Sequence, residues 1–442
     1  MTKLRQRNQM YKTTKMKKFL LPVMAIAAIT LVGCEEDDSA VESPKEKLNI
    51  INLRDAGKVV KDAKYNLANC KPEKSRETLE SFRYVGPLPL YYMDYAADVD
   101  WNALLSNSDN RIARYDTDEE NRRKHDLVLN TPASAAKYKR NACSGFVCHN
   151  TDGDLLFCRN FDDDTDPMVV IFNKDVKPGE YKNVMMCPWH EMDYTNLENA
   201  LTLPTFALDG MNEKGFCAAI YQLPDFQNNG NDTIVDPIEN MTPRPFGPDQ
   251  NTGKKQITTL FIINRLLTNC ATVEEAVSYL QSLDYTATYQ RLNAHFYIAD
   301  ASGKYLTLEY WKGSQGQDTL LVLTPEDRLL SMHNSLIQVP YEYNCIENYY
   351  CNPEASTTYR GDYWQYFFSG KTRATNLMSH YSLVMDEEEA LRCLQHGCFA
   401  ADAMGKVTDW SCVYNPVKRT VLFNMHDDLS NVYSIDLKDA LK

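Results

Sequence analysis

From residue 143 onward, short apolar runs alternate with polar turns, a pattern typical of a β-rich domain. The runs 143–149 and 155–160 flank the turn Asn150-Thr151-Asp152-Gly153, so they predict a hairpin. Further strands are predicted at 169–172, 215–223, 295–299, 305–310, 321–323, 329–332, 410–414, 420–425 and 432–435.

Three stretches carry apolar residues on one face at helical spacing. They predict helices over 257–267, 273–283 and 387–395, and Thr272 precedes the second as an N-cap. Strands, then two helices, then strands again favour an α+β domain in which two layered sheets carry helices outside.

The first residues form a targeting segment. A basic stretch precedes the apolar run 19–31, which is too short for a stable membrane span. The run ends in Leu-Val-Gly-Cys, which resembles the bacterial lipoprotein signal. We therefore predict a signal peptide at 1–33 and an acidic tether at 34–46 that begins with a lipidated Cys34. The protein would then be an outer-membrane lipoprotein of the cell envelope, periplasmic or surface-exposed. An ordinary secretory signal is the alternative.

Residues 47–142 differ in composition from the rest of the chain. The spacing of apolar residues over 48–63 predicts a short helix, and 107–142 is rich in polar residues that favour an accessible segment. The aromatic run Tyr91-Tyr92-Met93 fits either core packing or a lipid-binding surface.

Composition narrows the function. The chain has 442 residues, of which 43% are apolar and 24% charged, so a packed core is expected. The net charge of −13 argues against nucleic acid as a partner. The thirteen cysteines form no CxxC pair and HExxH is absent, so neither a metal site nor a cofactor is predicted.

Cys143 is the candidate nucleophile. If the bond between Ala142 and Cys143 is cut, the thiol and a new α-amine share one residue, and the amine can accept the thiol proton. The hairpin would return Arg159 and Asp162 beside this residue, where Arg159 can stabilise the thiolate and Asp162 can bind the amine. An ordinary hairpin with a surface ion pair is the alternative.

Several segments resemble choloylglycine hydrolases and penicillin V acylases, linear amide C–N hydrolases of the N-terminal-nucleophile (Ntn) superfamily. The segment 143–162 (Cys-Ser-Gly-Phe … Phe-Cys-Arg-Asn-Phe-Asp) and the segment 207–215 (Ala-Leu-Asp-Gly-Met-Asn-Glu-Lys-Gly) carry the resemblance most specifically. The segments 330–335 and 361–373 and the C-terminal strands extend it over most of 143–442.

The resemblance implies a four-layer αββα sandwich over 143–442, preceded by a partly helical pro-region at 47–142. It implies that Cys143 is the nucleophile, that Arg159 and Asp162 position it, that Asn334 donates to the oxyanion and that Arg373 organises the site. A substrate-binding position falls on Gln222 by direct count or on Tyr221 with a one-residue deletion.

The implied activity is hydrolysis of N-acyl amides through a thioester after self-cleavage. The long pro-region is similar to that of acid ceramidase and N-acylethanolamine acid amidase, in which it stays bound as a retained partner chain. Conjugated bile salts, penicillin V, acyl transfer to another amine and a non-catalytic surface lipoprotein are the alternatives. The sequence also leaves open a homo-oligomer.

Overall fold

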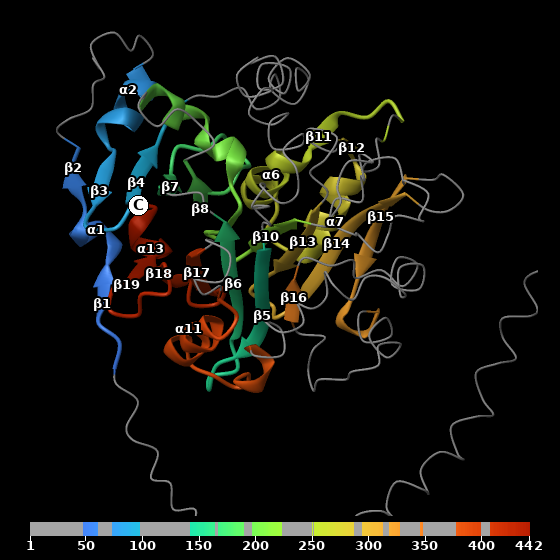
Figure 1. The fold of residues 1–442 in the computed structure, drawn as a ribbon. Helices are drawn as coiled ribbons and strands as arrows, with labels where there is room; N and C mark the ends of the chain where they lie inside the picture. The colour runs from blue at the N-terminus through green and yellow to red at the C-terminus, as the bar shows by residue number, and fades with distance from the viewer. Residues whose placement is uncertain are drawn as a thin grey trace, which may run out of the picture. The chain divides into compact units, whose positions relative to one another are not determined.

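The computed structural model describes residues 47–60, 73–97, 142–163, 167–189, 197–222, 250, 252–286, 294–312, 318–327, 345–347, 377–398 and 407–442. Within these ranges, two large sheets and a small third sheet make up the β-structure (Figure 1). Residues 48–442 form one compact unit, and the segment before it lies outside the described residues except for its last residue.

The first large sheet has seven strands and carries the predicted nucleophile. Its order is β1 (Ile50–Asn52), β19 (Val432–Asp436), β18 (Thr420–Met425), β17 (Val407–Asn415), β6 (Leu155–Asp163), β5 (Ala142–His149) and β16 (Cys345–Glu347).

The second large sheet has ten strands. Its order is β15 (Asp318–Leu323), β14 (Tyr305–Lys312), β13 (Ala294–Ala299), β10 (Cys217–Gln222), β9 (Asp209–Asn212), β8 (Asn183–Pro188), β7 (Met168–Asn173), β4 (Leu90–Tyr95), β3 (Arg83–Val85) and β2 (Lys58–Val59). The third sheet pairs β11 (Gln256–Thr258) with β12 (Asp284–Thr286).

The described helical segments are short. They are α1 (Leu53–Ala56), α2 (Glu73–Glu80), the 3₁₀ segments η3 (Leu197–Phe206) and η4 (Thr259–Phe261), α6 (Ile262–Asn269), α7 (Val273–Gln281), α11 (Glu387–Gln395) and α13 (Leu437–Ala440).

Three apolar clusters reveal the layers. One cluster lies between the two large sheets and includes Cys143, Phe157 and Trp410 from the first and Tyr221 from the second. Another packs the outer face of the ten-stranded sheet against α2, η3, α6 and α7. The last packs the outer face of the seven-stranded sheet against α11 (Figure 1). The predicted αββα order of layers is confirmed.

Local sequence explains the hairpin that carries the predicted nucleophile. The Asn150 side-chain oxygen accepts from the backbone amides of Asp152 (3.0 Å) and Asp154 (2.8 Å), which closes the turn between β5 and β6. Gly153 supplies the left-handed backbone, with φ of 85°, that this turn requires. The predicted hairpin is confirmed, and the strands of the C-terminal meander also lie where the pattern placed them.

The segment before Cys143 contributes strands to both large sheets. β1 pairs in parallel with β19, and β4 pairs in parallel with β7, so residues 50–95 extend an edge of each sheet. The helix predicted over 48–63 is wrong, because this stretch is divided among β1, α1 and β2. Tyr92 and Met93 are buried, at 6% and 0% exposure, which supports core packing for the aromatic run.

Two further predictions need comment. The helix predicted to start at Ile257 begins only at Ile262, because residues 256–258 pair with β12 and η4 intervenes. The strand predicted at 329–332 lies outside the described residues.

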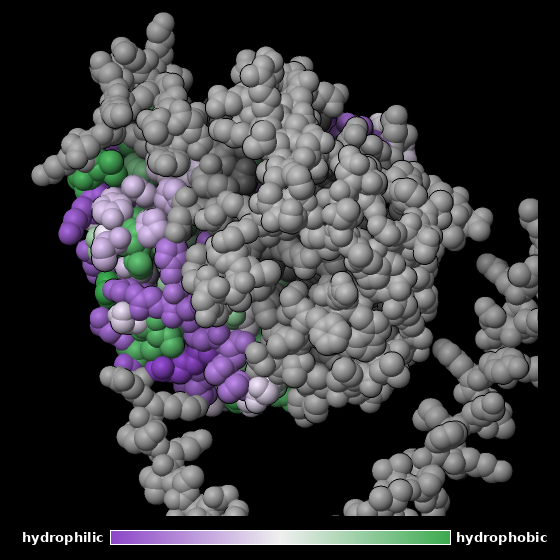
Figure 2. Space-filling view, viewed as in Figure 1, coloured by the Kyte–Doolittle hydropathy of each residue, from purple (hydrophilic) through white to green (hydrophobic). Residues whose placement is uncertain are grey.

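The visible described surface over β1–β3 and α13 mixes hydrophilic and hydrophobic residues (Figure 2). Ile50 and Val59 in these strands are 40% and 60% exposed. Among the described helices, we find none with the length and hydropathy needed to cross a membrane.

Candidate active site

Cys143 lies in β5, where it pairs with Phe161 of β6 and points into the cluster between the two sheets. Its side chain is 2% exposed. The thiol is therefore shielded from bulk water by its own strand neighbours and by the facing sheet, as a selective nucleophile requires.

Arg159 meets the thiol from the neighbouring strand. Its Nη2 lies 3.5 Å from Cys143 Sγ, and its Nη1 donates to the Leu208 carbonyl at 2.5 Å. The guanidinium is fully buried and lies 5.0 Å from the centroid of the Tyr221 ring. A fixed cation at this position stabilises negative charge on the sulfur.

Asp209 holds the arginine in place. Its Oδ2 lies 3.2 Å from Arg159 Nη1 and accepts from Trp410 Nε1 at 3.0 Å, while its Oδ1 accepts from the Tyr414 hydroxyl. Both members of the ion pair have no exposed side-chain area. A buried charge pair is tolerable only with such satisfied hydrogen bonds.

The pKa values of this pair reflect burial and mutual attraction. Burial lowers the pKa of Arg159, but the Asp209 carboxylate, and after it Cys143, raise it above its ordinary value. Burial raises the pKa of the Asp209 carboxyl, and Arg159, Tyr414 and Trp410 oppose this rise. The guanidinium therefore stays charged beside the thiol.

The sequence motif contained Asp209, but we assigned it no role. A usable signal was present, because Asp209 is the one acidic residue in the otherwise apolar run 207–211. A carboxylate in such a run must find a buried partner. The next residue, Gly210, packs against β8 so closely that only glycine fits, because a Cβ there would lie 2.2 Å from the Val184 carbonyl oxygen.

Asp162 occupies a different face of the sheet. It pairs with Ala142, the residue before the nucleophile, and follows Phe161, which points into the space between the sheets. Strand alternation therefore directs Asp162 toward the opposite, helix-covered face, where its carboxyl accepts from the Thr408 hydroxyl. The predicted cleavage bond thus lies beside Asp162, and Arg159 lies beside the thiol.

Tyr221 packs directly on the nucleophile strand. A Cβ added at Gly145 would lie 2.4 Å from the Tyr221 hydroxyl oxygen. The Tyr221 ring also lies 5.7 Å, centroid to centroid, from buried His295, which faces buried Glu309 at 3.7 Å. Sequence reasoning missed this His–Glu pair. Of Gln222, the alternative at this position, only the backbone is described.

Three predicted site residues lie outside the described residues: Asn334, Arg373 and Cys34. Their roles remain predictions. Within the described ranges, no group of three or more His, Cys, Asp or Glu side chains is arranged to hold a metal ion.

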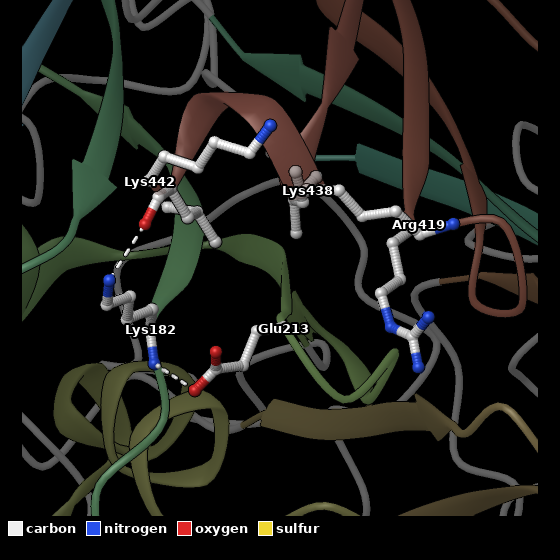
Figure 3. Close-up of a pocket in the computed structure, with 7 residues that line it drawn as sticks. Lys182, Glu213, Arg419, Lys438 and Lys442 are labelled. Carbon is white, nitrogen blue, oxygen red and sulfur yellow. Dashed lines mark hydrogen bonds between the residues drawn. The ribbon is translucent and has the colours of Figure 1, made fainter.

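A separate surface hollow of about 470 Å³ lies at the C-terminal helix (Figure 3). Glu213 of the Met-Asn-Glu-Lys-Gly motif lines it and accepts from the Lys182 amide at 3.2 Å. Its lining residues are Lys182, Glu213, Arg419, Leu437, Lys438, Leu441 and Lys442. This lining contains no cysteine, serine or threonine.

Residues 143–317 match the family model described as linear amide C-N hydrolases, choloylglycine hydrolase family. This segment is therefore similar to the hydrolase family that the motifs indicate, and that family's class of reaction is cleavage of carbon–nitrogen bonds in linear amides. The match begins at Cys143 itself. No curated protein matches the chain.

Solved structures similar to this chain include a mutant conjugated bile acid hydrolase from Clostridium perfringens, with 13% identity and a TM-score of 0.44 over 68% of this chain and 94% of that chain. Penicillin V acylase from Agrobacterium tumefaciens has 15% identity and a TM-score of 0.42 over 67% and 87%. A Caenorhabditis elegans N-acylethanolamine-hydrolyzing acid amidase ortholog has 13% identity and a TM-score of 0.35 over 62% and 93%.

Proposed function

We propose that this protein is a self-processing cysteine amidase that hydrolyses N-acyl amides through a thioester. One observation carries the proposal: Cys143 Sγ lies 3.5 Å from a buried arginine at the residue where the family match begins. A buried charge beside a thiol costs stability, so packing alone does not explain this arrangement. A cation that Asp209 fixes beside the sulfur favours the thiolate, which is the nucleophilic form.

The first step is hydrolysis of the bond between Ala142 and Cys143, in which water adds to the Ala142 carbonyl and leaves a carboxylate there. It converts the backbone nitrogen of Cys143 into an α-amine beside a thiol on the same residue. That amine takes the thiol proton, so no separate histidine is needed. The pairing of Asp162 with Ala142 supports a role for its carboxyl as the acceptor of a hydrogen bond from the new amine.

The thiolate then attacks the amide carbonyl carbon. Negative charge develops on the carbonyl oxygen, where Asn334 is the expected donor and Arg373 the expected organiser of the site. Loss of one oxyanion donor costs about 3–4 kcal/mol of transition-state stabilisation. The amine product leaves with the proton, and water hydrolyses the thioester to release the acid and the free thiol.

We favour substrates with an apolar acyl group, because Cys143 faces the apolar space between the sheets. Conjugated bile acids and penicillin V are the neighbouring candidates, named for two similar structures. Tyr221 beside the nucleophile strand gives a ring surface against which a substrate can pack.

We further propose that the protein acts as a lipoprotein of the cell envelope, anchored through Cys34. The segment 47–142 would be a pro-region that stays bound after self-cleavage. The pairing of β1 with β19 and of β4 with β7 supports retention, since release would expose an edge of each sheet.

The test is hydrolysis of a panel of N-acyl amides by the full chain and by two variants. Cys143→Ala removes the proposed nucleophile, and Cys148→Ala removes a buried thiol five residues further along β5, on the opposite face of the sheet. We expect product release and a mass increase equal to the acyl group with the parent and Cys148→Ala, and neither with Cys143→Ala. Turnover that survives in Cys143→Ala would refute the mechanism. If the parent protein hydrolyses none of the amides, the alternative of a non-catalytic surface lipoprotein stands instead.

A further inference from the structure

Asn160 joins the strand that carries Cys143 to the end of α11. It lies in β6 directly opposite Ser144, the residue that follows Cys143 in β5. Its amide nitrogen Nδ2 donates to Ser144 Oγ at 3.1 Å and to the Leu394 carbonyl, in the last turn of α11, at 2.9 Å. The Leu394 carbonyl can only accept, so the Asn160 amide must direct its nitrogen toward it. One side chain therefore connects two strands with a helix.

This contact lies on the face of the seven-stranded sheet that α11 covers (Figure 1). Cys143 points into the cluster between the two large sheets, so strand alternation directs Ser144 to the opposite face. Ser144 and Asn160 have no exposed area. A Cβ added at Gly397, just after α11, would lie 3.0 Å from Ser144 Oγ and 3.2 Å from Asn160 Nδ2. The pair is therefore enclosed between sheet and helix.

Stability alone does not explain an asparagine at this place. The face beneath α11 carries an apolar cluster, and the buried Oδ1 of Asn160 has no hydrogen-bond partner among the described residues. Such an unsatisfied acceptor costs stability, whereas apolar side chains of similar shape in place of both hydrogen-bonding partners can be neutral or stabilising. The Leu394 carbonyl does not depend on Asn160, because the Gly397 amide also donates to it at 2.9 Å. The asparagine amide therefore points to a role in holding Ser144.

The proposed self-cleavage makes this contact more important. In the uncut chain, Cys143 is held by peptide bonds on both sides. After the cut it is the first residue of its piece, and Ser144 is the second. Chain ends are poorly ordered unless they are tied down. Displacement of a reacting group by about 1 Å can lower a rate by about 100-fold.

We propose that Asn160 is a positioning residue for the new chain end. By tying Ser144 to the last turn of α11, it keeps the Cys143 sulfur beside Arg159, where the two side chains now lie 3.5 Å apart. Asn160 acts through Ser144 and not on the reacting atoms. The inference rests on the proposed self-cleavage and amide hydrolysis.

The experiment measures kcat and KM for the amide of the panel that the parent hydrolyses fastest, with cut molecules counted by intact mass. Asn160→Leu removes both hydrogen bonds. It should lower kcat by about 10- to 100-fold and leave KM almost unchanged, because the sulfur is displaced and the contacts to substrate are not. Ser144→Ala removes only the acceptor and should also lower kcat, so it serves as the test if Asn160→Leu does not cut itself.

The double variant Ser144→Ala/Asn160→Leu separates positioning from stability. It replaces both partners by apolar side chains, so its stability in urea should be higher than that of Asn160→Leu. Its kcat should stay as low as in Asn160→Leu, because the chain end is still untied. If kcat instead recovers together with stability, the role of Asn160 is purely structural and the proposal is overturned.

Asn183→Leu is the matched control. Asn183, in β8 of the other large sheet, is fully buried, and its Nδ2 donates to the Tyr181 carbonyl at 3.0 Å and to Thr268 Oγ1 at 3.4 Å. Its Oδ1 also has no hydrogen-bond partner among the described residues. Asn183→Leu should change stability by a similar amount and leave kcat as in the parent. An equal fall of kcat in both leucine variants would overturn the proposal.

Amide hydrogen exchange separates this proposal from the proposed function. In the uncut Cys143→Ala chain, Asn160→Leu should speed exchange at residues 144–147 severalfold, and Asn183→Leu should not. If the parent neither cuts itself nor hydrolyses an amide but this difference appears, the tie between Ser144 and α11 stands and the proposed function falls. If exchange at residues 144–147 does not change, the proposal falls whatever the parent does.

Discussion

The ion pair between Arg159 and Asp209 gives the sharpest quantitative prediction. Asp209→Asn removes one charge and keeps the shape of the side chain, so Arg159 remains buried without its counter-ion. Both side chains have no exposed area, and their closest atoms are 3.2 Å apart. Breaking such a buried pair costs about 3–5 kcal/mol of unfolding free energy.

Two other variants should lose less unfolding free energy than Asp209→Asn and serve as comparisons. Tyr414→Phe removes one hydrogen bond to the charged Asp209 and should cost about 1.5–3 kcal/mol. Asp300→Asn is the matched control, because Asp300 is also buried but accepts from the Val273 amide and Ser302 rather than from a buried arginine. It should cost about 1–2 kcal/mol.

The assay is urea unfolding followed by circular dichroism. All variants are made in Cys143→Ala, so that self-cleavage does not change the molecule during the measurement. In the parent with its thiol, Asp209→Asn should also slow alkylation of Cys143, because Arg159 is no longer fixed beside the sulfur. A loss below about 1 kcal/mol, or one equal to that of Asp300→Asn, would refute the reasoning.

Three further predictions follow from single features. Gly145→Ala should unfold the site or abolish cleavage, because its Cβ would lie 2.4 Å from the Tyr221 hydroxyl and 2.5 Å from the Cys158 carbonyl oxygen; full amide turnover in this variant would contradict the packing. After self-cleavage the two pieces should co-purify under native conditions and separate only in denaturant, because buried apolar side chains of residues 50–95 contribute more than about 10 kcal/mol of transfer free energy; spontaneous separation on a sizing column would argue against this. Because the pKa of Asp427 is raised to about 6, the Cys143→Ala chain should lose about 1–2 kcal/mol of stability as the pH rises from 4 through 6, after allowance for partial exposure. Thermal melts of Asp427→Asn in the Cys143→Ala background should lack this decline in stability. An identical decline would show that Asp427 is not the group whose titration causes it.

Local pattern was enough for the nucleophile hairpin. The alternation of 143–149, the Asn150 turn and Gly153 are all encoded within twenty residues, so the position of Arg159 near Cys143 could be predicted. The αββα layering followed from the same strand and helix patterns together with the family resemblance.

What the pattern missed depends on distant partners. The stretch 48–63 has helical spacing, yet Ile50–Asn52 form β1 because β19 offers an edge almost 400 residues away in sequence. Asp209 was missed for the same reason. Its importance comes from Arg159, which only the folded sheets bring to it.

The central claim is that Cys143 becomes a chain end. Intact-mass measurement of the purified full chain, with sequencing of the N-terminus of the larger piece, tests it directly. The account predicts two pieces, the larger running from Cys143 to Lys442, and one uncut chain for Cys143→Ala. A parent that remains a single chain, or a larger piece that begins at any other residue, would contradict the claim.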